Sequence, residues 1–157
     1  AQDRVLGRDG AVLEAVPNDK RDYRPDAKSR SSWELAVHLA PADVWFIDSI
    51  MSGSFAMDPS PEGAKKIEAM FGSVADVAAY YKKEFPAKLA ALRAMSADKL
   101  AAPIDFFGVM QMPAANYVGF ANNHSVHHRG QLASHLRAMG SKVPAIYGMS
   151  ADVPMGG

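Results

Sequence analysis

Histidine is the residue type of this chain best suited to chemistry, and the chain has five of them. His124 and His128 are separated by four positions, so on an α-helix they lie one turn apart and about 40° around the axis. Both rings can then reach the same point, which is the arrangement that a divalent cation requires of two imidazoles. The spacing alone is a weak signal, because short motifs of this kind also arise by chance.

A third histidine strengthens the prediction of a metal site. His38 lies in the apolar stripe of another predicted helix, and His124 and His128 lie on a stripe that continues to Leu132 and Leu136. A buried imidazole needs partners for both ring nitrogens, and three imidazoles that meet in a core satisfy one another best through a metal ion. The alternative is that His38 is a hydrogen-bonded core histidine and the pair is a polar patch. The spacing alone favours neither interpretation over the other.

Motifs that the sequence lacks narrow the chemistry. No glutamate follows the first histidine of the pair, so there is no HExxH motif and no zinc-protease general base. The long helices also lack the paired Glu-x-x-His motifs of di-iron bundles. A mononuclear site of three histidines with an open position for water fits best. Such a site can polarise a carbonyl group or lower the pKa of bound water or a bound thiol.

The other two histidines are predicted to lie outside this site. His127 is about 100° around the helix from His128 and should face outward. His135 lies on the same stripe as the pair, but it is two turns beyond His128 and too far to bind the same ion.

Two further residues of the last helix are candidates for supporting roles. Gln131, one turn from His128, could hold that ring through a hydrogen bond or be an ordinary buried amide. Arg129 lies about 100° around the helix from His128. It could bind an anionic substrate or pair with an acid at the edge of the bundle, and we favour the structural pair.

Three more candidates come from other segments. Glu34, one turn before His38, could orient that ring or act as a base, although a cap at the start of its helix is favoured. Trp45 lies close to the line of His38 and could wall a pocket, with a core position as the favoured alternative. Tyr147, in the loop after the last helix, could close over the site.

The elements that must position these residues are helices. Apolar residues recur at steps of three and four along the long segments, and capping residues stand at several of their starts. Pro41 and Pro86 lie inside two of these segments and predict kinks. The four long helices are predicted over residues 3–16, 31–51, 73–95 and 113–139.

The connections between these helices set the fold class. The segment 52–72 is long and holds a short helix that starts at Ser60-Pro61. The segment 96–112 is predicted to be irregular, with an extended piece at 106–112, and nothing alternates strongly enough to support a sheet. We therefore expect an all-α fold, a four-helix bundle with a long crossover connection between helices 2 and 3.

Length, charge and hydropathy limit the class of protein. The chain has 157 residues, 48% of them hydrophobic, and fits a single domain over 1–157. Its 17 lysines and arginines balance 17 acids, which argues against a nucleic-acid binder. No apolar run approaches the ~20 residues of a membrane span and no signal pattern is present, so we expect no membrane association and a cytoplasmic protein. The chain starts without methionine, so we expect a trimmed N-terminus, and 150–157 is predicted to be a flexible tail.

Several motifs of the chain resemble those of one known family. The segment NHSVHHRGQL, with WELAVHL upstream, is similar to the DinB-like (damage-inducible) four-helix-bundle family, which is related to mycothiol- and bacillithiol-dependent transferases and isomerases. The tracts Tyr23-Arg24-Pro25-Asp26 and Pro144 to Gly148 fit the same resemblance, which covers most of the chain. The resemblance implies that His38, His124 and His128 bind a divalent metal, nickel or zinc before manganese or iron. It shifts the balance towards metal binding.

The leading functional hypothesis follows from the family resemblance together with the amino-acid composition. We expect a metal-dependent enzyme that acts on a small molecule by hydrolysis or by thiol-dependent transfer or isomerisation. Because the chain has no cysteine, it has no thiol nucleophile, and any thiol must arrive as a low-molecular-weight cosubstrate. We also expect a homodimer. The alternative is a non-catalytic metal-binding or stress-associated interaction protein in which the metal site only stabilises the bundle. A third hypothesis is a metal-free module in which the histidines are polar core residues.

Overall fold

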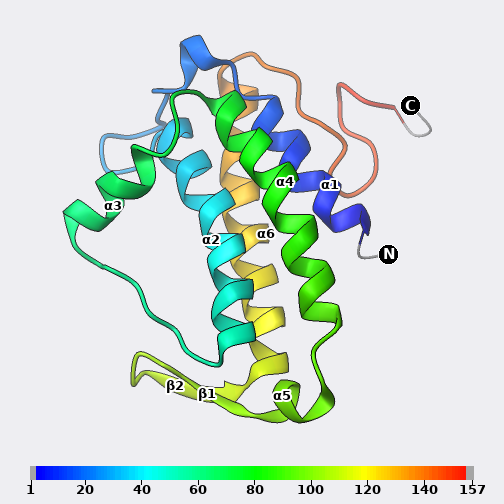
Figure 1. The fold of residues 1–157 in the computed structure, drawn as a ribbon. Coiled ribbons are helices and arrows are strands. Elements are labelled where there is room, and N and C mark those ends of the chain that lie inside the picture. Colours follow the sequence, from blue (N-terminus) through cyan, green and yellow to red (C-terminus); the bar gives the residue numbers. More distant parts are fainter. Residues whose placement is uncertain (1–2, 155–157) are drawn as a thin grey trace.

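The structure of this chain is a computed structural model that describes residues 3–154, with side chains described from residue 8 onward. Four long helices dominate it, α1 (Asp3–Glu14), α2 (Ser32–Ser52), α4 (Val74–Arg93) and α6 (Ala114–Ala138). Both α1 and α2 pack against α4 and α6, so the four form a bundle (Figure 1). The predicted all-α class is confirmed for the body of the molecule.

The crossover between the second and third long helices has the predicted place in the chain. Helices α2 and α4 run in the same direction, so the chain must return along the bundle between them (Figure 1). The returning segment contains the short helix α3 (Pro61–Glu68), in which Pro61 takes the first helical position and the Ser60 side chain accepts a hydrogen bond from Gly63 N.

Helix α2 carries His38 and is defined at both ends by caps. Ser31 and Glu34 form a capping box, in which each side chain accepts a hydrogen bond from the other's backbone N–H. Gly53 ends the helix with a φ of 74°, which a residue with a Cβ rarely adopts. The helix runs through Pro41 without ending there, as α4 runs through Pro86.

Helix α6 carries the other two histidines of interest and is the longest element, at 25 residues. Pro113 is its N-cap residue rather than its first helical residue, a difference of one position from the prediction. Gly140, with a φ of 74°, follows its end. This single uninterrupted helix fixes the relative placement of His124 and His128.

A small hairpin corrects the expectation that the chain contains no sheet. After the short helix α5 (Ala97–Ala101), strands β1 (Pro103–Phe106) and β2 (Met110–Pro113) pair antiparallel. Each strand is only four residues long, too short for alternation to show in the sequence. Ile104 is buried and its carbonyl accepts a hydrogen bond from the Tyr117 hydroxyl, which ties the hairpin to α6. The hairpin and α5 lie at one end of the bundle (Figure 1).

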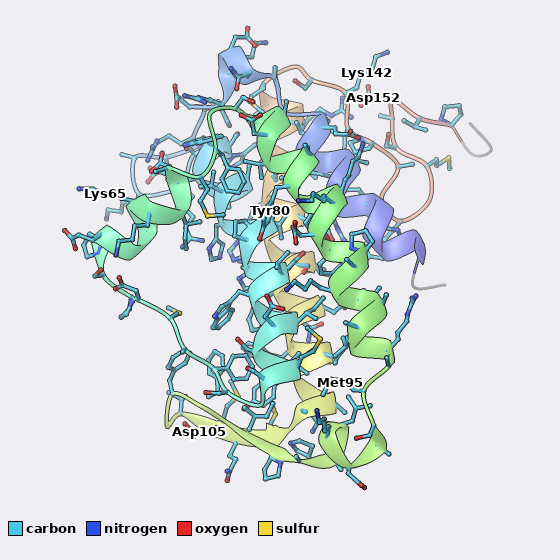
Figure 2. All side chains as sticks on the ribbon, in the orientation of Figure 1. Lys65, Tyr80, Met95, Asp105, Lys142 and Asp152 are labelled. Carbon is cyan, nitrogen blue, oxygen red and sulfur yellow. The ribbon has the colours of Figure 1, made fainter. Side chains whose placement is uncertain are left out.

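Side chains fill the space between the helices (Figure 2). The buried apolar side chains form two clusters. One cluster joins α1, α2, α4 and α6 near the start of α2, and the other joins α2, α4, α6 and the hairpin near its end. Along α2, His38 lies within the stretch that forms the first cluster, and the buried Asp43 lies between the two clusters. The first cluster includes Val12, Leu13, Leu35, Val77, Leu132 and Leu136, and the second includes Phe46, Ile47, Ile50, Leu92, Ile104 and Tyr117.

The end of the described chain folds back on α6. Asp152 pairs with Arg137 at 2.6 Å and accepts a hydrogen bond from Val143 N at 2.9 Å. The rest of the tail predicted over 150–157, residues 155–157, lies outside the described residues. Within the described part of the chain, no helix is both long enough and apolar enough to cross a membrane.

Candidate metal centre

Three half-buried histidines from two helices meet at one point between α2 and α6. His38 comes from α2, and His124 and His128 come from successive turns of α6. The Nε2 atom of His38 lies 3.0 Å from Nε2 of His124 and 3.1 Å from Nε2 of His128. These are the residues that the sequence singled out, and a group with this geometry could hold a metal ion.

The spacing of the three nitrogens fits a shared ion. Histidine nitrogens bind zinc and similar metals at about 2.0–2.1 Å, so two of them on one ion lie roughly 2.9 Å apart at a right angle and roughly 3.4 Å apart at the tetrahedral angle. The observed separations of 3.0 and 3.1 Å fall inside this range. Three neutral imidazoles would otherwise point their Nε2 atoms at one another with too few protons to bridge them.

Gln131 holds one of the three rings in the orientation that metal binding requires. Its Oε1 lies 2.8 Å from Nδ1 of His128. Because an amide oxygen only accepts, His128 must donate its Nδ1–H, which leaves the lone pair of Nε2 free and directed at the cluster. By contrast, Nδ1 of His124 is buried with no hydrogen-bond partner among the described residues, and packing against the Phe46 ring at 5.3 Å holds that imidazole instead.

Burial keeps the three imidazoles neutral near pH 7. It is the main cause that lowers the pKa of His38 to about 3 and that of His124 to about 4. Burial also lowers the pKa of His128, and the positive charge of Arg30 adds to the effect on all three rings. Neutral imidazole is the form that binds a metal, so the site needs little proton release to become a ligand set.

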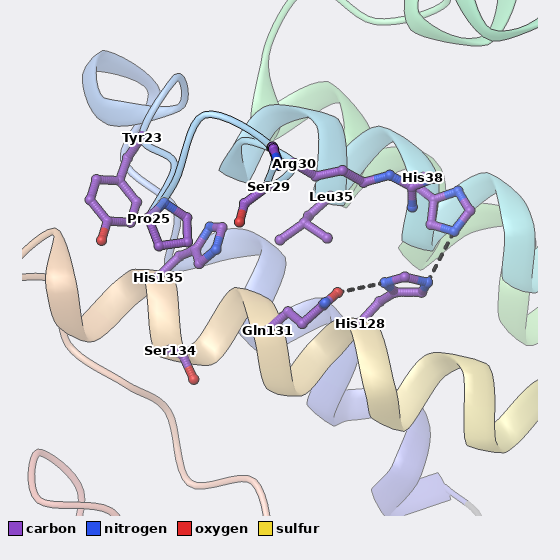
Figure 3. Close-up of a pocket in the computed structure, with 11 residues that line it drawn as sticks. Tyr23, Pro25, Ser29, Arg30, Leu35, His38, His128, Gln131, Ser134 and His135 are labelled. Carbon is purple, nitrogen blue, oxygen red and sulfur yellow. Dashed lines mark hydrogen bonds between the residues drawn. The ribbon is translucent and has the colours of Figure 1, made fainter.

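A cavity of about 760 Å³ opens beside the cluster. His38 and His128 both line it, together with Gln131 and residues of the loop before α2 (Figure 3). A volume of this size is typical of small-molecule sites. An ion held by the three rings would therefore face a space large enough for a ligand.

Comparison with known proteins places the chain in a family. The sequence profile of the DinB family matches residues 7–153. The chain belongs to the DinB family. No curated protein sequence matches it.

Solved structures similar to this DinB-family chain agree in fold. A DinB-like protein from Bacillus subtilis has a TM-score of 0.70 at 22% identity, over 90% of this chain and 91% of its own. A DinB-like protein from Bacillus cereus has a TM-score of 0.66 at 22% identity, over 93% of both chains. The mycothiol-dependent maleylpyruvate isomerase has a TM-score of 0.55 at 14% identity, over 92% of this chain and 65% of its own. At these identities the likeness shows the fold alone.

The remaining histidines of this DinB-family chain lie where the helical geometry predicts. His127 is exposed on α6. His135 is buried two turns from the cluster, where its Nδ1 lies 3.1 Å from the Ser32 hydroxyl and its ring meets the edge of Tyr23. Neither belongs to the group of converging nitrogens.

Two of the other candidates, Glu34 and Trp45, make structural contacts outside the histidine site. Glu34 completes the capping box of α2 and pairs with Arg24 at 3.3 Å, and the hydrogen bond from Ser31 N is the main cause that lowers its pKa. Trp45 donates its indole N–H to Ala56 O at 2.8 Å and packs against Phe55. Neither side chain lines the cavity beside His128.

Arg129 belongs to a separate buried network, and the exposed Tyr147 contacts this network from outside. Arg129 is 1% exposed, and its Nη1 lies 2.8 Å from Oδ1 of Asp9. Its Nη2 lies 2.9 Å from the Tyr147 hydroxyl. Arg129 therefore makes the structural ion pair that the sequence favoured. It also bonds to the hydroxyl of Tyr147, the residue that was a candidate to close over the histidines.

Sequence reasoning missed the rest of this network. The Tyr81 hydroxyl contacts Oδ2 of both Asp9 and Asp43 at 3.2 Å, and the Ser125 hydroxyl donates to Oδ1 of Asp43. Burial is the main cause that raises the pKa of Asp9 and raises that of Asp43 to about 7. One signal was present in the sequence, because Asp43 interrupts an apolar helix, and Ser125 directly follows a histidine of the cluster.

The contact between Gln131 and His128 leads to a test of the metal centre. Replacing Gln131 with leucine removes the acceptor of the Nδ1–H and frees the ring to turn, so we expect zinc affinity to fall by about 10- to 100-fold. Competition titration with a chelator of known affinity measures the change. The matched control is Ser134→Ala. Ser134 lines the same cavity, and among the described residues its hydroxyl bonds only to Gly130 O. Zinc affinity within twofold of the parent in Gln131→Leu would show that the ring needs no such support.

Proposed function

We propose that this chain binds a divalent metal ion through His38, His124 and His128 and uses it to act on a small molecule in the adjoining cavity. One observation carries the proposal. Three neutral imidazoles converge through their Nε2 atoms, at separations of 3.0 and 3.1 Å, and two of them, those of His38 and His128, line a cavity of about 760 Å³. A purely structural metal site is normally closed, whereas a catalytic one keeps a position open towards substrate.

The donor set favours certain metals. Three imidazoles and no carboxylate in the cluster suit nickel or zinc better than manganese, which prefers oxygen ligands, and iron is a further candidate. The metal, when bound, would polarise a carbonyl group or lower the pKa of a bound thiol or water.

The residues of the chain define what the protein itself contributes. Gln131 orients His128, burial keeps the ligands unprotonated, and the cavity supplies the space for substrate. No aspartate or glutamate is among the described residues that line the cavity, so the chain offers no carboxylate general base there. The chain also has no cysteine, so it cannot supply a thiol nucleophile.

These features support a thiol-dependent reaction ahead of hydrolysis. An external thiol with a lowered pKa would be both ligand and nucleophile, and it would need no protein base. The similarity of the fold to the mycothiol-dependent maleylpyruvate isomerase supports the same choice. We therefore propose transfer to, or isomerisation of, a small electrophile with a low-molecular-weight thiol as cosubstrate, and metal-dependent hydrolysis as the second candidate.

Turnover of a substrate panel tests the proposal. Metal-free protein is loaded with zinc, nickel or manganese and assayed with mycothiol, bacillithiol or glutathione against small electrophiles, and without thiol against esters and amides. We expect thiol-dependent turnover that appears only with metal and is lost in His38→Ala. The matched control is His127→Ala, an exposed histidine of the same helix as two of the ligands. Tight metal binding without any metal-dependent turnover would instead support a structural or interaction role.

A further inference from the structure

The charge of the cavity beside the histidines is one-sided. The loop between residues 21 and 31 places Lys28 and Arg30 on its wall, and its other described lining residues include no acid (Figure 3). Leu35 and Pro25 contribute apolar surface, and Ser29 and Ser134 contribute hydroxyl groups. A small molecule in this space would therefore meet two cations, an apolar patch and no anion.

Arg30 differs from its neighbours because its side chain is not used by the fold. Arg24 pairs with Glu34, and Arg21 donates to Gly72 O. The guanidinium of Arg30 has no hydrogen bond or ion pair with any of the residues that the structure describes. Figure 3 shows its side chain extending towards His38. Its charge is close enough to lower the pKa values of His38 and His124.

The carboxylates near this charge are engaged with other groups. Glu68, which lines an adjoining pocket together with Arg30, accepts a hydrogen bond from the Trp33 indole N–H at 2.6 Å. Glu34 accepts from Ser31 N in the capping box and pairs with Arg24. Asp26 accepts from Lys28 N at 2.8 Å, and its backbone carbonyl accepts from Ser29 N. These bonds also fix the backbone of the loop that carries Arg30, which limits the backbone entropy lost when a ligand binds.

Gln131 adds a neutral donor on the facing helix. Its Oε1 is occupied by His128, and the amide is fixed in this orientation. Its Nε2 group has no hydrogen-bond partner among the described residues and belongs to a side chain that lines the cavity. A guanidinium on one wall and an amide N–H on the other are donors without acceptors, which is the pattern expected of a site for an anion.

We infer that the cavity selects a small-molecule substrate that carries an oxyanion, a carboxylate or a phosphate, bound by Arg30 with help from Lys28. The planar guanidinium can bind either group through two parallel hydrogen bonds. The oxyanion end would lie at the loop before α2, and the reactive end would lie at the three histidines. The statement that the bound anion is a substrate rests on the proposed function. Binding of the anion itself needs no metal.

Binding of small probes to metal-free protein tests the inference separately from catalysis. Succinate and inorganic phosphate are titrated into the protein, with succinamide as the neutral counterpart of succinate, and affinity is measured by calorimetry or by amide shifts in NMR. We expect succinate or phosphate to bind and succinamide to bind at least tenfold more weakly. Arg30→Gln should weaken binding of the anion by about 10- to 100-fold, because it removes charge-assisted hydrogen bonds.

Matched variants and the two probes make every outcome informative. Lys65→Gln removes one exposed positive charge from α3, away from the cavity, and should leave anion affinity unchanged. Tighter binding of succinate than of phosphate would identify a carboxylate site, and the reverse would identify a phosphate site. Equal affinity of the parent and Arg30→Gln, or equal affinity for succinate and succinamide, would overturn the inference. Anion binding that depends on Arg30 in a protein with no metal-dependent turnover would overturn the proposed function and keep the anion site.

Discussion

Replacing His124 with alanine is expected to lower the zinc affinity of the protein by more than about 100-fold, since even partners outside the ligand set contribute about 10- to 100-fold. Only two imidazoles would remain, and the ring that lies 3.0 Å from His38 would be gone. The loss of zinc affinity should also reduce the stabilisation of the folded protein by zinc. A metal that binds only the folded state adds about 4 kcal/mol at a thousand times its dissociation constant, so zinc should raise the Tm of the parent much more than that of the variant.

The measurement is a pair of thermal melts for each protein, with and without zinc, together with a direct zinc titration. His127→Ala is the matched control, because it removes an exposed imidazole three positions away on the same helix. The metal-free variant should stay folded, because the removed ring carries a buried Nδ1 without a hydrogen-bond partner in the described structure. A zinc-dependent shift in Tm of equal size in His124→Ala and in the parent would exclude the three-histidine site as the place where the metal binds.

Local signals were sufficient to predict the long helices. The start of α2 is encoded by Ser31 and Glu34, which form the capping box within four residues of sequence, and the start of α4 by Ser73 and Asp76. The hairpin at 103–113 was missed because its strands depend on contacts with α6, such as the bond from the Tyr117 hydroxyl to Ile104 O. Short strands carry too few residues for their own sequence to specify them.

The part of the site that lies on one helix could be predicted from helical geometry. The separation of four positions places His124 and His128 together, and one further turn places Gln131 against His128. His38 meets His124 and His128 only through the tertiary packing of α2 on α6. The sequence could indicate this contact only through an inward-facing stripe and a family resemblance. The cation of Arg30 was not foreseen, because only the folded loop shows that its neighbours are already paired.

The buried network behind the cluster explains how α6 is held against the other helices. Ser125 follows His124 and Arg129 follows His128, so each of these two turns of α6 presents a histidine to the cluster and a polar partner to the interior. Ser125 bonds to Asp43 of α2, and Arg129 bonds to Asp9 of α1. The helix that carries two of the three histidines is therefore bonded from behind to α2, which carries the third, and to α1.

The hydrogen-bond partners in the network are best satisfied when one carboxyl group is protonated. The Tyr81 hydroxyl lies 3.2 Å from carboxylate oxygens of both Asp9 and Asp43, but it has one proton to donate. Asp9 also has the charge of Arg129 at 2.8 Å, so Asp43 is the group better able to hold the extra proton. The rise of the pKa of Asp43 to about 7, caused mainly by burial, agrees with this assignment.

Asp43→Asn should therefore stabilise the protein at high pH. The folded-state pKa of about 7 exceeds the ordinary value of 3.8, so between these pH values the folded protein holds a proton that the unfolded chain releases. The stability of the parent must fall as pH rises through this window. Asparagine keeps the shape and the bonds of the protonated acid, so we expect the free energy of unfolding at pH 8 to rise by up to about 4 kcal/mol, with little difference near pH 4.

Urea unfolding of parent and variant at pH 4, 6 and 8 measures the effect, and Asp48→Asn is the matched control. Asp48 lies one turn further along α2, where it is partly exposed and pairs with Lys88 at 2.7 Å, so its replacement should change stability little at any pH. A loss of stability in Asp43→Asn that is equal at all three pH values would mean that Asp43 is ionised in the folded state. The proton shared through Tyr81 would then be absent, and the support behind the histidines would be a charged network instead of a neutral one.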